Sequence, residues 1–334
     1  MKRPGLLLLI AFFSLFLLGI HRESVAAPYY EGKVIRIIVG YQVGGNYDRI
    51  ARILAKHLSK YIPGKPAIIV QNMVGASSMI ATNYLYNMAK PDGLTIGTFD
   101  HYIPFTQLLK MDGVKFDITK FAWIGSAASE SFLLALRTDL PFKTIDDLRK
   151  AKDPINIASG AVGSSDYTFP AMLKEFAGFN FRMINYDSSS SEMLAIERRE
   201  ADGRAGAYST LKPYIANGLL RPVVRSRVPE SGVENLPVNE DLTTSKIGKA
   251  IMGLMSSADV IFRPYAAPPK TPDHIMTILR TAFAKTIQDP QLKEDAKKMM
   301  LSLNYTPTDE TLKILNYIMS QPDIVVKEFG KYIK

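Results

Sequence analysis

Residues 34–58 read VIRIIVGYQVGGNYDRIARILAKHL, and this stretch indicates how the whole chain is built. Its first six residues are apolar except for Arg36 and mostly β-branched, which is typical of a strand buried on both faces of a parallel sheet. After a glycine-containing loop, Ile50, Leu54 and Leu58 recur at a spacing of four, as on one face of a helix. The stretch therefore predicts a strand, a loop and a helix, with Asn46 as the helix N-cap.

The loop between this strand and this helix predicts a small anion site. Gly44 and Gly45 let the backbone pass close to a ligand, and the free N–H groups at a helix start attract negative charge. Asp48 would lie in the first helical turn, where a carboxylate suits the helix dipole. The glycines fit neither a P-loop nor G-x-G-x-x-G, so these nucleotide motifs are excluded. A loop that caps a helix and binds nothing is the alternative.

Residues 1–27 are interpreted as a secretory signal peptide. Lys2 and Arg3 precede the apolar run 6–18, and Ala26 and Ala27 offer cleavage positions. This run is shorter than the ~20 residues of a membrane-spanning helix, and an uncleaved anchor is the alternative. The chain has no cysteine, which excludes disulfides, zinc–thiolate sites and a lipid-bearing cysteine. Together these features predict a periplasmic protein.

The charged residues favour an anionic ligand over nucleic acid or a metal. The formal net charge is +9, yet Lys and Arg occur in no run longer than a pair, so we expect no nucleic-acid partner. The histidines lack metal-ligand spacing, and we expect neither a metal nor a cofactor. No G-x-S-x-G elbow occurs. Asp100-His101, at the end of a predicted strand, keeps a secreted hydrolase or lyase open as an alternative.

The rest of the chain predicts two α/β domains, each a mostly parallel sheet flanked by helices. Strands at 66–73 and 94–99 with short turns extend the first sheet. The pattern changes at 121–138, which we interpret as a crossing into a second domain, and the helices after Pro272 return to the first. The predicted domains are 28–126 plus 259–334, and 127–258.

A second loop, residues 159–166, repeats the small-residue pattern of the first. It follows the predicted strand 155–158 and precedes a helix. If the two loops face each other across a cleft, backbone N–H groups and serine hydroxyls hold a ligand from both sides, which suits a carboxylate. Ser164 could instead serve only as a helix cap. We therefore expect a binding protein, not an enzyme.

Six segments in this order resemble the tripartite tricarboxylate transporter substrate-binding proteins, the Bug receptor family. They read IRIIV, GYQVGGNYDRIARILAKHL, IIVQNMVGAS, KPDGLTIGT, INIASGAVGSS and PPKTPDHIMTILRTAFAKTIQDPQLKEDAKKM, and they span essentially the whole mature chain. The resemblance implies a periplasmic solute receptor with a two-domain, type II binding-protein (Venus flytrap) fold. Such a receptor closes on a carboxylated small molecule and delivers it to membrane subunits of the transporter. We expect it to act as a monomer.

The resemblance also implies which residues hold the ligand, carried over by position. The first loop would contribute Tyr41, Gln42, Val43, Gly44, Gly45, Asn46 and Asp48, and the second-domain loop Ala161, Val162, Gly163, Ser164 and Ser165. The pocket would be completed by Gly75, Ser77, Asp100, Asp187, Ser188 and Tyr208.

The chain departs from the family pattern at both loops. Residues 40–43 replace the prolines of the family's first loop, and Asn46 stands where the third glycine is expected. Asp187 replaces the lysine of the family's Tyr-Lys-Gly, which disfavours a di- or tricarboxylate. We therefore expect a monocarboxylate or an aromatic acid. A ligand sensor that feeds a sensor kinase is a further alternative, which the sequence does not separate from transport.

Overall fold

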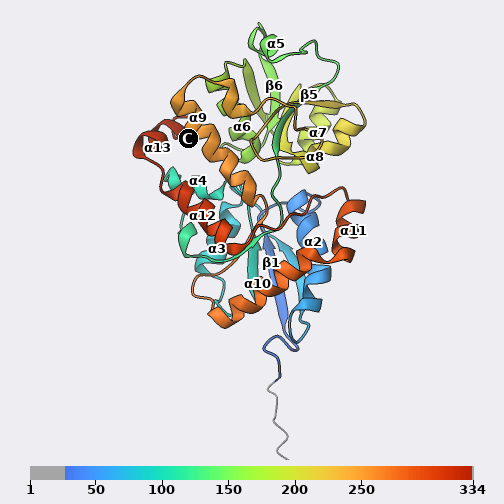
Figure 1. Cartoon of the computed structure of the whole chain (residues 1–334), viewed down its shortest axis with the longest axis vertical. Coiled ribbons are helices and arrows are strands. Elements are labelled where there is room, and N and C mark those ends of the chain that lie inside the picture. The colour runs from blue at the N-terminus through green and yellow to red at the C-terminus, as the bar shows by residue number, and fades with distance from the viewer. Residues whose placement is uncertain (1–26, 333–334) are drawn as a thin grey trace, which may run out of the picture.

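The computed structural model describes residues 27–332 and consists of two lobes, each built on a five-stranded sheet (Figure 1). The first lobe, at the bottom of Figure 1, has the strand order β2-β1-β3-β10-β4, and the second lobe has β7-β6-β8-β5-β9. The predicted two-domain α/β class is confirmed. The predicted signal peptide falls on residues that lie outside the described part, apart from Ala27.

The bounds of the elements follow the chain in order. The strands of the first lobe are β1 (Val34–Val39), β2 (Ala67–Asn72), β3 (Thr95–Thr98), β4 (Ala122–Ser126) and β10 (Pro264–Ala267). Those of the second are β5 (Phe132–Arg137), β6 (Ile155–Ser159), β7 (Phe181–Asn185), β8 (Gly203–Ala207) and β9 (Leu220–Arg225). The helices are α2 (Asn46–Leu58), α3 (Met79–Asn87), α4 (Ile103–Leu108), α5 (Ile145–Arg149), α6 (Ser165–Ala177), α7 (Ser189–Glu197), α8 (Tyr208–Ala216), α9 (Lys246–Ala258), α10 (Asp273–Gln288), α11 (Pro290–Lys298), α12 (Thr308–Met319) and α13 (Asp323–Phe329).

The opening strand lies at the centre of the parallel part of its sheet. β1 pairs in parallel with β2 on one side and with β3 on the other. Ile35, Ile37 and Val39 are fully buried, as the apolar run predicts. β10, from the far end of the chain, lies antiparallel between β3 and β4 and so completes the first sheet. The chain thus passes from one sheet to the other twice, while the predicted domain boundaries stay a prediction.

The two crossing segments, residues 127–131 and 259–263, are hydrogen bonded to each other along their backbones. The Ala127 N–H donates to the Arg263 carbonyl at 2.9 Å, and the Phe262 N–H donates to the Ala128 carbonyl at 2.9 Å. The Glu130 N–H donates to the Asp259 carbonyl at 3.3 Å. These segments therefore form one paired connection between the lobes.

Helices cover both faces of each sheet. In the first lobe, α2 and α10 bury Ile50, Leu54 and Phe283 against one face, and α3 packs with Trp123 on the other. In the second lobe, α6 and α9 share one apolar core, while α7 and α8 lie over the opposite face. Among residues 27–332, no helix combines the length and apolar character needed to cross a membrane.

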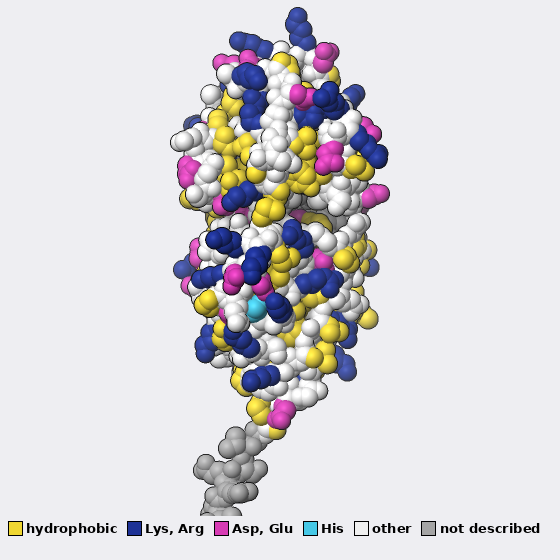
Figure 2. Space-filling model, turned by 90° about the vertical axis from the view of Figure 1, so that its right-hand side faces the viewer, with side chains coloured by type: hydrophobic (Ala, Val, Ile, Leu, Met, Phe, Trp, Pro, Cys, Tyr) yellow, Lys and Arg dark blue, Asp and Glu magenta, His cyan; other side chains and the backbone are white. Residues whose placement is uncertain are grey.

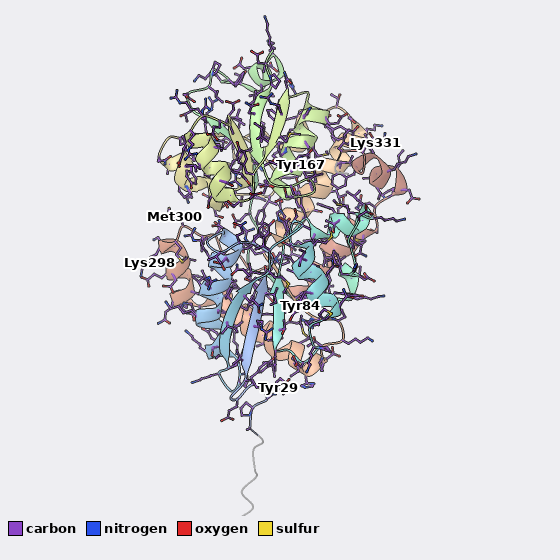
Figure 3. All side chains as sticks on the ribbon, turned by 180° about the vertical axis from the view of Figure 1, so that it is seen from behind. Tyr29, Tyr84, Tyr167, Lys298, Met300 and Lys331 are labelled. Carbon is purple, nitrogen blue, oxygen red and sulfur yellow. The ribbon has the colours of Figure 1, made fainter. Side chains whose placement is uncertain are left out.

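The C-terminal helix contacts the second lobe, although the sequence predicts that the last helices complete the first. Val325 and Phe329 of α13 are buried in the same apolar core as residues of α9. The Tyr332 hydroxyl donates to Glu175 of α6 at 3.0 Å. Figure 3 accordingly places Lys331 level with Tyr167 of the second lobe. An apolar helix face packs wherever a complementary surface is offered, and α4 and α9 offer it jointly.

Truncation of Phe329 tests whether α13 stabilises the whole chain. Phe329 is fully buried and meets Phe105 edge-on, with ring centroids 5.4 Å apart. We expect Phe329→Ala to lower the free energy of unfolding by about 3–5 kcal/mol in urea denaturation, because it leaves a cavity. Ile324→Ala, in the same helix but 72% exposed, is the control and should change it by less than about 0.5 kcal/mol. Equal effects of the two would contradict a structural role for this helix face.

Candidate functional site

A cavity of about 710 Å³ lies between the two lobes. Figure 2 shows a hollow at the waist between them, with Lys and Arg side chains spread over both lobes. Residues that follow the carboxyl ends of β1, β3, β6, β7 and β8 line it. This is the place where open α/β sheets bind ligands, because helix N-termini and loops meet there.

Four helix N-termini contribute to the cavity wall. α2 and α6 are 13 residues long, and Gly45 and Ser164 at their N-cap positions line the cavity. α7 and α8 begin at the same wall, through Ser188 and Ser209. The first N–H groups of a helix have no partner within the helix and carry partial positive charge. The cavity therefore presents a positive backbone potential from both lobes.

Asp48 holds the first loop in place, and the two glycines of this loop differ in backbone conformation. Gly44 has a φ of +89°, which favours glycine, whereas Gly45 has an ordinary φ and room for a side chain. Asp48 accepts the Gly44 N–H and an Asn72 side-chain N–H, both at 2.9 Å. Burial raises its pKa, but hydrogen bonds from Arg52, Gly44 and Asn72 outweigh this, so the pKa lies below its usual range. Asp48 does not line the cavity; it supports the loop that does.

Side chains of the first loop bridge to the second lobe. The prediction of Asn46 as the N-cap is wrong, because Gly45 occupies that position and Asn46 begins the helix. The Asn46 side chain instead donates to the hydroxyls of Thr210 at 2.9 Å and Ser209 at 3.3 Å. The Gln42 side chain donates to the Asp187 carbonyl at 3.3 Å. The lobes are thus joined across the cavity mouth.

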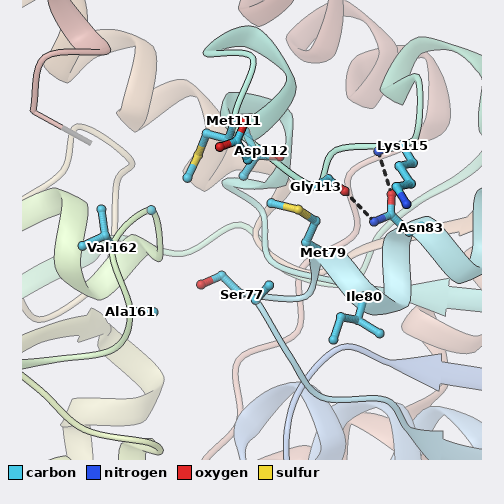
Figure 4. A pocket seen from close by; sticks show the side chains of 13 residues that line it. Ser77, Met79, Ile80, Asn83, Met111, Asp112, Gly113, Lys115, Ala161 and Val162 are labelled. Carbon is cyan, nitrogen blue, oxygen red and sulfur yellow. Dashed lines mark hydrogen bonds between the residues drawn. The ribbon is translucent and has the colours of Figure 1, made fainter. Parts of the chain in front are cut away.

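The second-domain loop divides between two hollows. Ala161, Ser164 and Ser165 line the cavity, whereas Val162 and Gly163 line a neighbouring groove of about 530 Å³. Figure 4 shows Ala161 and Val162 facing Met79 and Met111 across this groove. Ser164 is at the N-cap, but its hydroxyl lies 2.7 Å from the Ala161 carbonyl, faces Asp166 and caps no helical N–H. The same loop therefore borders a second groove, into which Met79 and Met111 contribute apolar surface.

The remaining predicted residues lie mostly at the cavity. Those that line it are Tyr41, Gln42, Val43, Gly44, Gly45, Asn46, Gly75, Ser77, Asp100, Asp187 and Ser188. Tyr208 does not: its hydroxyl lies beside Gly232, and the next two residues, Ser209 and Thr210, face the cavity instead. A helix turns its side chains by about 100° per residue, so the strand end alone does not tell which one points inward. Ligand contact by these residues stays a prediction.

Two buried arginines at the cavity were missed from the sequence. Arg204 lies in β8 and pairs with Glu192 at 2.8 Å. Arg263 lies at the end of the second crossing segment, with its guanidinium 4.2 Å from the centre of the Tyr47 ring. Each arginine stands alone inside an apolar or small-residue run, VIFRPYAA and GRAGA. An arginine in such a run indicates a buried guanidinium, which is costly without a partner. This signal could have identified both residues from the sequence.

Comparison with known proteins identifies the family. The family described as "Tripartite tricarboxylate transporter family receptor" matches residues 50–330. The chain belongs to this family. The receptor is 26% identical over 317 residues to a UPF0065 protein in the gbd 5′ region of Cupriavidus necator, covering 91% of this chain and 90% of that one. It is 27% identical to a UPF0065 protein of Bordetella pertussis, covering 88% of each.

Solved structures share the fold of this receptor. The periplasmic binding protein BugD matches with a TM-score of 0.72 at 20% identity, covering 91% of this chain and 98% of its own. MatC from Rhodopseudomonas palustris, with bound malate, matches with 0.69 at 16% identity, covering 88% and 99%. An R. palustris protein with adipate matches with 0.70 at 19% identity, covering 90% and 98%. The predicted Bug-type receptor is confirmed, and the comparisons support neither alternative function.

Asp100 and His101 of the receptor line the cavity, and both ring nitrogens of His101 lie close to other side chains. His101 Nδ1 lies 3.3 Å from the Tyr47 hydroxyl, and its Nε2 lies 3.0 Å from Asp259. Burial, and then the nearby Arg263, holds the pKa of His101 well below its usual range. Both ring nitrogens thus face structural partners, and no serine hydroxyl is bonded to the ring in residues 27–332. The pair tethers the cavity floor to the crossing segment.

Asp100 makes the stability of the ligand-free receptor depend on pH. Burial, opposed by hydrogen bonds from Tyr41 and the Tyr102 N–H, raises the pKa of Asp100 to about 6. Between the pKa of Asp100 in the unfolded chain and about pH 6, Asp100 is more ionised in the unfolded state than in the folded state. The free energy of unfolding therefore falls as the pH rises. The loss is on the order of 3 kcal/mol at full ionisation.

We expect Asp100→Asn to abolish this pH dependence. Urea unfolding of both proteins from about pH 4 to pH 8 measures it, and the difference in unfolding free energy should shift in favour of the variant as pH rises. A constant difference across the range would contradict the assignment.

Proposed function

We propose that this receptor acts in the periplasm as a monomer, binds a small carboxylate between its lobes and delivers it to the membrane subunits of a tripartite transporter. The observation that carries the proposal is the combination of helix N-termini and a buried guanidinium at one cavity. It is a binding role rather than a catalytic one. The signal-like residues 1–27 and the family support the location.

Arg263 is a buried guanidinium that has no ion pair among the described residues. It is 2% exposed, and among the described residues no carboxylate lies within the 4.0 Å of an ion pair. Its Nη1 donates to the Phe262 carbonyl at 3.0 Å, while its Nε has no partner in this part of the chain. A buried cation without an anion is costly, and a planar carboxylate matches the guanidinium fork. A ligand carboxylate would supply the missing partner.

The size and walls of the cavity support a small organic acid. A volume of about 710 Å³ lies within the range of small-molecule sites. Phe132, Tyr186, Tyr214 and Phe262 line it and supply aromatic surface. MatC and the R. palustris protein, which carry malate and adipate, share this fold. Within that class we propose a ligand with one carboxylate, or an aromatic acid, since Asp187 replaces a lysine of the family pattern.

A thermal-shift screen and calorimetry against mono-, di-, tri- and aromatic carboxylates test the proposal. A ligand at a hundred times its dissociation constant stabilises by roughly 2.7 kcal/mol, which is a visible shift. We expect Arg263→Gln to weaken binding of the carboxylate found by more than tenfold. Arg198→Gln, an exposed residue at the end of α7, is the control and should leave the affinity unchanged. Absence of a shift with every carboxylate would overturn the proposed function.

Gly45→Val is a second test of the same cavity. The position has an ordinary φ, and the nearest atom to an added Cβ is the Gln42 carbonyl oxygen at 3.6 Å, so the variant should fold. The isopropyl group would lie over the N-terminus of α2 and block the approach of a carboxylate. We expect an unchanged unfolding midpoint and a loss of binding in calorimetry. Wild-type affinity in this variant would move the site away from α2.

A further inference from the structure

Charged side chains of both signs line the interlobe cavity, and most of the arginines already have partners. Arg204 donates to Ser189 and pairs with Glu192. Arg49 donates to the Met299 carbonyl at 2.7 Å and to Asn46 at 3.3 Å. Arg263 is the guanidinium left with an unpartnered N–H among the cavity residues that the structure describes. The cavity wall therefore contains one buried guanidinium, that of Arg263, without an ion pair among the described residues.

Two carboxylates from opposite lobes line the cavity, and among the described residues no Lys or Arg nitrogen lies closer than 3.9 Å to either. Asp100 follows β3 of the first lobe and accepts from the Tyr41 hydroxyl, from the Tyr102 N–H at 2.7 Å and from the Ser165 hydroxyl at 3.5 Å. The ring nitrogen of His101 lies 3.5 Å from it, but burial keeps that ring neutral. These partners are neutral donors, and Arg263, which lies beyond ion-pair distance but lowers the pKa of Asp100, compensates its charge only in part.

Asp166 approaches the same cavity from the second lobe. It lies in the first turn of α6 and accepts from the Ser164 hydroxyl. Its nearest guanidinium, that of Arg204, is 3.9 Å away and already paired with Glu192 at 2.8 Å. Asp166 also raises the pKa of Asp100, after the larger effect of burial, which means that the two negative charges repel each other across the cavity.

We propose that the ligand is a zwitterion whose carboxylate lies at Arg263 and the N-terminus of α2, and whose cationic nitrogen lies between Asp100 and Asp166. This inference rests on the proposed function and names the class of the carboxylate. An ammonium group would neutralise both carboxylates as the lobes close on it. The Tyr41 hydroxyl is bonded to Asp100, and the Tyr41 ring is stacked on Tyr47, which fixes its position beside this carboxylate. An amino acid, or a carboxylate with another basic nitrogen, has this chemistry.

A dicarboxylate is disfavoured by the same geometry. With one carboxylate at Arg263, the second would lie against Asp100 and Asp166 in a site shielded from water. Repulsion between negative charges at such short distances lowers the affinity of a ligand. Proteins commonly use it to reject a wrong ligand. The cavity therefore separates an amino acid from the dicarboxylate of equal length.

Matched ligands of one chain length give the sharpest test. Hexanoate, adipate and 6-aminohexanoate share a six-carbon chain and differ only at the far end. A second set, butanoate, succinate and 4-aminobutanoate, and a panel of α-amino acids cover other lengths. We expect calorimetry at neutral pH to show that the tightest ligand of the panel carries an amino group. Its dicarboxylate counterpart should bind at least tenfold more weakly.

Substitution of the two carboxylates assigns the effect to them. Asp100→Asn and Asp166→Asn should each weaken binding of the amino compound by more than tenfold, whereas neither should weaken binding of the matching monocarboxylate, because each removes a negative charge. Asp146→Asn, a 71% exposed carboxylate of the same lobe as Asp166, is the matched control. If Asp100→Asn does not fold, the more accessible Asp166, with a side chain 16% exposed, carries the test alone.

The outcomes separate the two proposals. Tighter binding of dicarboxylates than of amino compounds, or equal loss of both ligand classes in the Asp166→Asn variant, would overturn the zwitterion while leaving the carboxylate receptor intact. Failure of every carboxylate, with or without an amino group, to bind would overturn the proposed function and this inference with it.

Discussion

The backbone pairing of the two crossing segments is the constraint on which the site depends. Hydrogen bonds between residues 127–131 and 259–263 set the distance and the angle at which the two sheets meet. This pairing brings Phe132 and Phe262 together at the base of the cavity, with stacked rings whose centroids are 5.9 Å apart. Arg263 leaves the same segment toward the cavity. Because these contacts belong to neither sheet alone, the connection between the lobes and the floor of the cavity are built from the same few residues.

Electrostatics of the helix ends then decide what the cavity attracts. Each sheet delivers helix N-termini to the interlobe space, and a carboxylate stands in the first turn of α2, α6 and α7. The carboxylates of Asp48 and Glu192 form ion pairs with Arg52 and Arg204. Such pairing cancels part of the positive potential at those ends. Among the described residues, Arg263 and Asp100 have no Lys, Arg, Asp or Glu partner within 4.0 Å, and Asp166 has only the Arg204 guanidinium at 3.9 Å.

Buried polar groups beneath the cavity account for the histidine that follows Asp100. Tyr47, His101 and Asp259 form a bonded chain that is shielded from water, and burial raises the pKa of Asp259 well above its usual range. Such a chain is costly to bury unless each member finds a partner. Its members bond to one another and to the crossing segment. The chain therefore fastens the two lobes where their relative position matters.

The sequence by itself determined the α/β class, the family and the two loops, because these depend on local periodicity, on glycine and serine spacing and on the order of motifs along the chain. Tertiary structure alone decided which side chains meet. Asn46 becomes a bridge to Thr210 instead of a cap, α13 packs on α9, and Arg263 joins Asp100 at one cavity although 163 residues separate them in number. Spacing along the chain carries no information on such contacts, since they arise only when the chain crosses twice between the lobes.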